Sequence, residues 1–296
     1  MLQLSYAVVT PARNEAENLG RLACCLAEQT ALPSRWIIVD NGSTDSTLAI
    51  AQDLEREHRW VRVLRVLGEA EITRGAPIVR AFHAGLEAVG SEPDLVVKID
   101  ADVSMEPDFF ERLLDAFAIE PTLGIAGGTC YEWSHGRWSP QRVTRSHVRG
   151  ATRAYRWACL QDVLPLEERI GWDGIDELKA RARGWGTASL PDLRFHHHRA
   201  LGRRENAFRV WLAQGEMAHY MWYRPSYVVL RSLFRSRRNP AAVAMIGGYI
   251  AAALRRRRRL DDASAVAHLR HEQSLRRLPQ RIREAIGRQA SSEERA

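Results

Sequence analysis

The sequence is poor in several features that would assign it to other classes of protein. It has only four cysteines in 296 residues, two of them adjacent and none with the spacing of a zinc site. It contains no apolar run of about 18 residues, so we expect no ordinary transmembrane helix. Met1 leads into the apolar segment 4–9 without a basic region before it, which is unlike a signal peptide. We therefore expect a cytoplasmic protein with reduced, buried thiols.

The composition is that of a globular protein with an uneven charge. Hydrophobic residues make up 45% and charged residues 27% of the chain, and its length allows a large core. The net charge of +7 comes mainly from the arginine-rich part after residue 199. This asymmetry predicts a basic surface that meets an anionic partner. We expect one domain over residues 1–205 and a helical, basic arm over 206–296.

Strands and helices are predicted to alternate over the first hundred residues. Four apolar runs predict buried strands, at 5–10, 36–39, 61–66 and 94–99. Three segments with helical spacing separate them, at 16–30, 44–58 and 74–90. This alternation predicts an α/β fold with parallel strands and right-handed crossovers. The pattern then loosens, and we expect irregular chain at 136–149, a short helix at 150–161 and a helix at 171–183.

Three of the predicted strands end in polar or acidic groups. The three turns are Pro11-Ala12-Arg13-Asn14-Glu15, Asp40-Asn41-Gly42-Ser43-Thr44-Asp45 and Asp100-Ala101-Asp102. In open α/β sheets, ligands bind beyond the carboxyl ends of the strands. Asp100 and Asp102 can hold a hard divalent cation there, and Asp40 can accept hydrogen bonds from a ribose or a base. A helix cap explains any one turn, whereas three turns at one edge predict a ligand site.

These motifs, in this order and spacing, resemble the family 2 glycosyltransferases of the GT-A fold over roughly residues 5–200. The resemblance implies a Rossmann-like nucleotide-binding domain with a mixed central sheet. It implies inverting transfer of a sugar from a UDP-, GDP- or dTDP-linked donor to a hydroxyl acceptor, a hexosyltransferase reaction of class EC 2.4. It also implies an Mg²⁺ or Mn²⁺ cofactor bound by Asp102. The implied nucleotide pocket contains Pro11, Arg13, Glu15, Asp40, Asp100 and, from the next helix, Arg80.

Such a reaction needs a base that takes the proton of the acceptor hydroxyl. The segment 171–177 offers Asp173 and Asp176 as catalytic candidates. The family usually has Glu-Asp here, with the Asp as base, whereas this chain has Trp172 before Asp173. Spacing back from Gly184 favours Asp173, and an aliphatic-Asp pattern favours Asp176, so both assignments stay open. A capping box at the start of the helix explains the same residues without catalysis.

Three histidines and an arginine follow the extended segment 188–195. If the strand continues, His196 and His198 share one face and His197 points to the other. Histidine binds Mn²⁺ beside carboxylates, and members of the family often carry a histidine at this point. We therefore expect His198 at the metal and Arg199 on the diphosphate, with a solvated histidine run as the alternative.

The segment 147–152 lies where the resemblance implies that the acceptor binds. Gly150 would allow a sugar to approach the backbone closely, and Trp172 would stack on a sugar face. Core packing is the alternative for the tryptophan.

The C-terminal arm combines aromatic residues, an apolar segment and arginines. Residues 240–254 are uncharged and would form a helix of about 22 Å, short of the ~30 Å hydrocarbon core. Five arginines in a row follow, Arg255–Arg259. Residues 225–259 are thus predicted to lie on an anionic membrane surface. A buried helix or a homo-oligomer contact is the alternative, and nucleic acid is not expected without a recognised binding module.

The combined prediction is a peripheral enzyme on the inner face of the cell membrane, acting on a lipid-linked or surface-polysaccharide intermediate. Two other classes stay open. A sugar-phosphate nucleotidyltransferase also uses carboxylates and Mg²⁺, but usually has a glycine-rich loop after the first strand, which residues 11–15 lack. A non-catalytic, membrane-bound sugar-binding protein is disfavoured by the presence of Asp100, Asp102 and Asp173.

Overall fold

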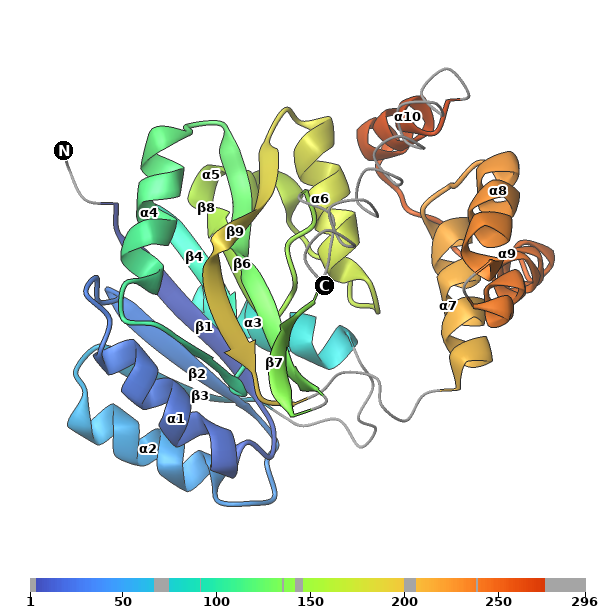
Figure 1. Cartoon of the computed structure of the whole chain (residues 1–296). Coiled ribbons are helices and arrows are strands. Elements are labelled where there is room, and N and C mark those ends of the chain that lie inside the picture. The colour runs from blue at the N-terminus through green and yellow to red at the C-terminus, as the bar shows by residue number, and fades with distance from the viewer. Residues whose placement is uncertain are drawn as a thin grey trace. The chain divides into compact units, whose positions relative to one another are not determined.

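The computed structural model describes residues 4–66, 75–90, 92–134, 136–141, 146–199, 206–237 and 239–274. The chain forms two compact units, Met1–Leu201 and Gly202–Ala296 (Figure 1).

The first unit is built on one sheet of nine strands. They are β1 (Tyr6–Ala12), β2 (Arg35–Asn41), β3 (Val61–Val66), β4 (Leu95–Ile99), β5 (Val103–Met105), β6 (Leu123–Ser134), β7 (Arg137–Pro140), β8 (Thr152–Arg156) and β9 (Gly186–His197). Its helices are α1 (Ala16–Ala27), α2 (Thr47–Glu57), α3 (Ala76–Glu87), α4 (Phe109–Ile119), α5 (Trp157–Val163) and α6 (Trp172–Ala182). The predicted alternation of strands and helices over the first hundred residues is confirmed.

The sheet is mixed, with the order β3-β2-β1-β4-β8-β6-β9-β5 and β7 paired to β6. β1 is parallel to β2 and β4, and β2 to β3, as connections through a helix require. β8 is antiparallel to both β4 and β6, and β9 is parallel to β6 but antiparallel to β5. The carboxyl ends of β1, β2 and β4 consequently lie at one edge of the sheet. The end of β9 lies at the same edge, because it pairs with β5, which directly follows β4 in the chain.

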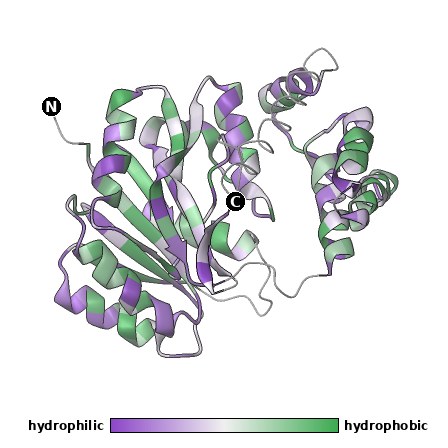
Figure 2. Cartoon of the chain, viewed as in Figure 1, coloured by the Kyte–Doolittle hydropathy of each residue, from purple (hydrophilic) through white to green (hydrophobic). Residues whose placement is uncertain are grey.

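Alternate residues of the central strands belong to two separate cores. Val8, Ile38 and Val97 lie in the cluster that also contains apolar residues of α1, α2 and α4. Their neighbours in sequence, such as Val9 and Ile37, lie in the cluster with residues of α3, α5 and α6. The central strands are therefore apolar on both faces, which explains their near-continuous apolar runs. Figure 2 accordingly colours much of these strands as hydrophobic.

Two sequence-based expectations after residue 102 were wrong. Within the expected irregular segment 136–149, residues 137–140 form β7, which pairs with β6; residues 142–145 lie outside the described part of the chain. The expected helix at 150–161 is instead β8 followed by α5. β8 is buried between β4 and β6, so long-range pairing decides its conformation, and no local pattern shows this.

The second unit is helical. It contains α7 (Ala207–Tyr220), α8 (Pro225–Ser236), the 3₁₀ turn η1 (Pro240–Val243), α9 (Ala244–Leu254) and α10 (Ala263–Glu272). A Cβ on Gly215 would lie 2.1 Å from the Met245 carbonyl oxygen, and one on Gly248 would lie 2.1 Å from that of Leu212. These two glycines let α7 and α9 pack backbone to backbone. Within the part of the chain that the structure describes, no helix is long and apolar enough to cross a membrane.

Candidate active site

The turns after β1 and β2 are bonded to each other at the carboxyl edge of the sheet. The Glu15 amide donates to Thr47 Oγ1 at 2.7 Å, and the Asn14 amide donates to Ser43 Oγ at 3.1 Å. The Thr44 amide in turn donates to Asn14 Oδ1 at 2.8 Å. Pro11 and Arg13, predicted in the nucleotide pocket, lie partly exposed at the end of β1 in this same corner. The first two predicted motifs thus form one joined surface.

Asp40, the last residue but one of β2, lies inside this corner and is fully buried. Its Oδ1 accepts a hydrogen bond from the Ser43 amide at 3.2 Å. Its Oδ2 lies 3.9 Å from Arg65 Nε and accepts no hydrogen bond from a described residue. A buried carboxylate oxygen without a donor is a suitable acceptor for a ligand N–H or hydroxyl.

Asp100 is held in place by its surroundings on β4 and β8. Lys98, buried in β4, donates through Nζ to Asp100 Oδ1, and also to the Gly150 carbonyl oxygen at 2.7 Å. The Asp100 amide donates to the Ala151 carbonyl oxygen at 2.8 Å. Asp100 itself remains partly exposed, so its carboxylate is fixed by a buried cation yet accessible.

Asp102 lies beside His197 and Arg199. Its Oδ1 is 3.2 Å from His197 Nε2, and its Oδ2 is 3.6 Å from Arg199 Nε. Burial alone would raise the pKa of Asp102, but the His197 hydrogen bond and the two positive charges lower the pKa overall. The same contact raises the pKa of His197, although burial opposes it. Asp102 is therefore held ionised.

Asp100, Asp102 and His197 form what we call the strand-end cluster. One ligand atom from each side chain lies within 4.8 Å of the others. Two carboxylates and an imidazole at this separation suit Mn²⁺ or Mg²⁺. Behind the ring, His197 Nδ1 lies 3.7 Å from the buried Glu132 Oε1. A carboxylate behind a metal-binding histidine is a common way to orient the ring.

The expected position of His198 at the metal needs correction. In the register of the sheet, His197 is the partner of Glu132 on β6 and of Val103 on β5. The His197 side chain consequently points toward the Asp102 carboxylate. His198 is exposed, and its Nε2 lies 2.8 Å from Ser104 Oγ. The alternation of faces was predicted correctly, but the sequence alone did not show which face meets Asp102.

Arg199 bridges two of the predicted motifs. Its guanidinium bonds Glu15 Oε2 at 2.8 Å and approaches Asp102. Burial raises the pKa of Glu15 overall, even though Asn18 and Arg199 act against this shift. The side chain of Arg199 is 56% exposed and is thus available to a ligand anion beside the strand-end cluster. Arg80, by contrast, lies on α3 in an exposed ion pair with Glu168 at 2.6 Å.

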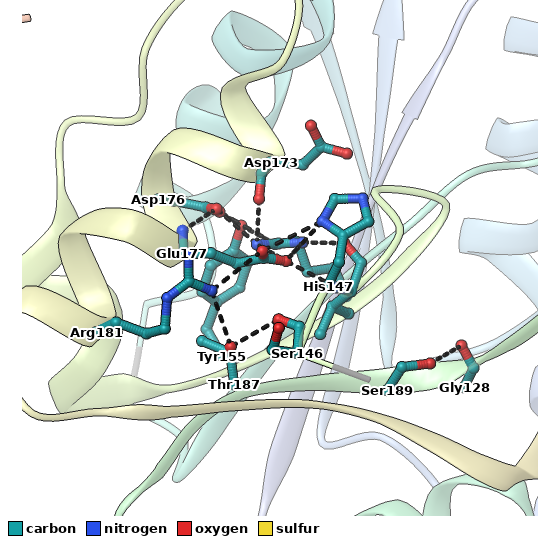
Figure 3. A network of polar contacts seen from close by, with 12 residues as sticks. Gly128, Ser146, His147, Tyr155, Asp173, Asp176, Glu177, Arg181, Thr187 and Ser189 are labelled. Carbon is teal, nitrogen blue, oxygen red and sulfur yellow. Dashed lines mark hydrogen bonds and ion pairs between the residues drawn. The ribbon is translucent and has the colours of Figure 1, made fainter. Parts of the chain in front are cut away.

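Asp173 lies in the first turn of α6, next to Gly150. A Cβ on Gly150 would lie 3.7 Å from Asp173 Oδ2, so the carboxylate lies against Gly150. The Gly150 carbonyl is the group bonded by Lys98, which also holds Asp100. Asp173 is partly exposed, and its carboxylate points away from the buried charges of α6 (Figure 3). The fold therefore brings Asp173 into the corner that contains Asp100.

The predicted catalytic role does not fit Asp176, which is only 1% exposed. Arg153 Nη2 donates to its Oδ1 at 2.5 Å, and Arg153 Nε donates to its Oδ2 at 3.1 Å. Tyr155 also donates to Oδ2. The neighbouring Glu177 accepts from Arg153 and from the Val148 amide (Figure 3). Asp176 is thus a structural partner of Arg153, and we call this set with Glu177, Tyr155 and His147 the Arg153 network.

The two predicted acceptor residues contact each other. Trp172 is 7% exposed and belongs to the core beneath α6, so its ring presents no free face to a sugar. A Cβ on Gly150 would lie 3.1 Å from Trp172 Cζ2. The missing side chain at Gly150 therefore makes room for the tryptophan, which corrects the expected stacking role of Trp172.

Sequence reasoning missed Lys98, Arg153 and His197. Lys98 is the one charged residue in the apolar run of β4, and a lysine in a buried strand usually has a partner nearby. Arg153 could not be found in this way, because its strand was predicted as a helix.

The chain matches a known protein family over more than half of its length. Residues 7–162 match the model described as Glycosyl transferase family 2, which is more than half of the chain. The chain belongs to the family 2 glycosyltransferases, as the motifs predicted.

Two curated relatives are similar over part of their length. The chain is 30% identical over 148 residues to polyprenol monophosphomannose synthase of Mycolicibacterium smegmatis, covering 48% of this chain and 54% of that protein. It is 26% identical over 219 residues to beta-monoglucosyldiacylglycerol synthase of Synechocystis sp., covering 64% and 40%. The chain thus spans about half the length of the curated relatives it matches.

Solved structures share the fold. The mannosyltransferase PcManGT from Pyrobaculum calidifontis, in complex with GDP-Man and Mn²⁺, has a TM-score of 0.56 at 16% identity, covering 98% of this chain and 81% of that one. S. aureus TarS 1–349, in complex with UDP-GlcNAc, has a TM-score of 0.54 at 20% identity, covering 73% and 66%. The mixed α/β sheet is therefore the GT-A fold, as predicted.

Proposed function

We propose that the protein transfers a sugar from a nucleotide-diphosphate donor to a hydroxyl acceptor with inversion at the anomeric carbon. The observation that carries the proposal is the strand-end cluster, with Asp173 in the same corner of the sheet. Membership of the family and the names of both curated relatives, each a glycolipid or lipid-linked sugar synthase, support it.

The donor is proposed to lie over the ends of β1, β2 and β4. The buried Asp40 Oδ2 is available to a base or ribose, and Arg199 is available to a phosphate. Asp100, Asp102 and His197 would hold Mg²⁺ or Mn²⁺, which when bound neutralises the diphosphate. Pro11, Arg13 and Glu15 would line the nucleotide pocket, and Arg80 would have to leave Glu168 to reach it.

Asp173 is proposed as the base. Its carboxylate is partly exposed and lies against Gly150, within the corner that holds Asp100. A carboxylate there can take the proton of the acceptor hydroxyl as the oxygen attacks. Asp176, with both oxygens bonded to Arg153 or Tyr155, is not available for this step.

The acceptor is proposed to be lipid-linked, and the second unit to bind the inner face of the cell membrane. Apolar side chains of α7, α8 and α9 are exposed there, namely Phe208, Val229, Leu230, Leu233, Phe234, Ile250 and Leu254. Arg255–Arg258 are exposed beside Leu254, whereas Arg259 packs over Trp222 at 4.0 Å. Apolar groups next to arginines suit an anionic bilayer. A homo-oligomer contact is the alternative use of this surface.

Turnover of nucleotide sugars tests the proposed reaction. The purified chain is incubated with UDP-, GDP- and dTDP-sugars and Mn²⁺ or Mg²⁺, and nucleotide release and thermal stabilisation are measured. We expect one donor to be turned over only with metal, and the D173N variant to bind it without turnover. Pyrophosphate exchange in place of nucleotide release would indicate a nucleotidyltransferase, and binding without turnover by the wild type would indicate a non-catalytic protein.

Co-sedimentation with vesicles tests the proposed membrane contact. We expect binding to vesicles with phosphatidylglycerol, weaker binding as salt rises, and none to neutral vesicles. Replacing Arg255 and Arg257 by Gln should weaken binding about 10-fold or more, at about 1 kcal/mol per arginine. The matched control replaces the exposed Arg56 and Arg59 of the first unit. Equal binding by all variants, or a dimer that dissociates in the Arg255/Arg257 variant, would contradict the proposal.

A further inference from the structure

Trp172 directly precedes Asp173 at the N-terminal end of α6. The proposed function uses Asp173, the next residue, and leaves the tryptophan without a role. Its ring is buried, so it does not act by stacking on substrate. It lies at the N-terminal end of α6, beside Gly150. A buried aromatic ring next to the proposed base can act only through its protein contacts.

Two buried cations lie over the Trp172 ring. Lys98 Nζ is 5.8 Å and Arg153 Cζ is 5.7 Å from the ring centroid. Lys98 and Arg153 are register partners on β4 and β8, so both side chains leave the same face of the sheet. A cation within about 6 Å of an indole is attracted to it, more strongly when water is excluded. The contact therefore ties the start of α6 to two central strands.

Each of the two cations also holds one part of the proposed site. Lys98 bonds the Asp100 carboxylate and the Gly150 carbonyl. Arg153 Nη2 donates to the main-chain carbonyl oxygen of Asp173 at 2.7 Å. Lys98 thus holds Asp100, which is proposed to contact the donor, and Arg153 holds the backbone of Asp173, the proposed base. Both cations contact the Trp172 ring.

We propose that Trp172 is a positioning residue, whose ring, held by Lys98 and Arg153, sets the separation between Asp100 and Asp173. This rests on the proposed function in taking Asp173 as the base. The neutral indole attracts both cations and leaves their hydrogen bonds to the site intact.

Two variants of Trp172 separate the aromatic contact from packing. W172L keeps an apolar side chain without a ring, and W172F keeps an aromatic ring. We expect W172L to lower kcat about 10–100-fold, as misplacement of a reacting group does, with the donor KM within about twofold of wild type. W172F should stay within about threefold in kcat. Hydrogen–deuterium exchange of segments 146–150 and 172–176 should rise in W172L and not in W172F.

A tryptophan at the other end of α6 provides the matched control. Trp185 donates through Nε1 to Asp162 Oδ2 at 2.7 Å and packs against the same core. W185L should leave kcat and the exchange of 146–150 unchanged. Equal losses in W172F and W172L, or wild-type exchange and kcat in W172L, would overturn the proposal. If the wild type turns over no nucleotide sugar, the proposed function fails, and the exchange data alone then decide whether Trp172 holds this segment.

Discussion

The strand-end cluster and the Arg153 network contain similar side chains but differ in how their charges are matched. In the network, every nitrogen of the Arg153 guanidinium donates to a carboxylate, a carbonyl or Tyr155. In the strand-end cluster, ligand atoms from three side chains point toward one another. Arg153 occupies both oxygens of Asp176 together with Tyr155, which makes that carboxylate structural. Lys98 bonds only Oδ1 of Asp100, and this difference supports the proposal that the strand-end cluster binds a ligand. The same contrast separates Asp176 from Asp173 on one helix.

Removing the cation of the network should give the largest effect on stability. R153M would leave Asp176 and Glu177 buried without their partner, and we expect a loss of about 3–5 kcal/mol in the free energy of unfolding. Denaturant titration measures this loss. The control R181M removes a partly exposed arginine 3.6 Å from Glu177 and should cost less than about 1 kcal/mol. Similar losses of stability in R153M and R181M would mean that the Arg153 network does not have the structural role given to it here.

Neutralising each aspartate of α6 should separate activity from stability. D173N is expected to lower kcat about 10²–10⁴-fold, because it removes the proposed base, with the free energy of unfolding within about 0.5 kcal/mol of wild type. D176N should instead lose about 1–3 kcal/mol of stability, because it weakens buried hydrogen bonds. Steady-state turnover and denaturant titration on both variants check this. The reverse pattern would make Asp176 the base.

Exchanging the histidines of β9 should test which one faces the carboxylates. H197A is expected to weaken Mn²⁺ binding about 10–100-fold, as loss of an oriented ligand does. H198A, the matched control one residue away, should bind Mn²⁺ like the wild type. Isothermal titration with the metal alone gives both affinities. Weaker Mn²⁺ binding in H198A only would mean that His198 is the metal ligand, as the sequence predicted.

The smallest expected effect is a pH dependence at the edge of the network. Burial alone would lower the pKa of His147, but the hydrogen bond and charge of Glu177 raise it overall. The stabilisation is thus complete below the unfolded pKa of about 6.5 and is lost as the pH rises through the folded value. At pH 6, H147Q should lower the free energy of unfolding by less than about 1 kcal/mol for this half-buried pair. The loss should appear as a lower Tm than that of the wild type. The difference should vanish at alkaline pH, and a constant difference would contradict the assignment.

Much of the fold and part of the site could be predicted from the sequence. The parallel strands and their polar ends were visible because they depend on local apolar runs and on turns next to them. β8 was not visible, because a central antiparallel strand between β4 and β6 is specified by its partners. The face of His197 depends in the same way on pairing with β5 and β6. The burial of Asp176 against Arg153 could not be predicted either, because the strand that carries Arg153 was expected to be a helix.

The short ladder between β5 and β9 has a consequence for the order of folding. It brings His198 against Ser104 across 94 residues of chain, and the His198 amide against the Asp102 carbonyl. A contact across so long a loop forms only after the intervening chain has collapsed. During synthesis, β1 to β4 and both aspartates of the strand-end cluster emerge well before His197 and Arg199. We therefore expect the nascent chain to acquire the proposed nucleotide corner early and the complete strand-end cluster only when β9 adds to the sheet.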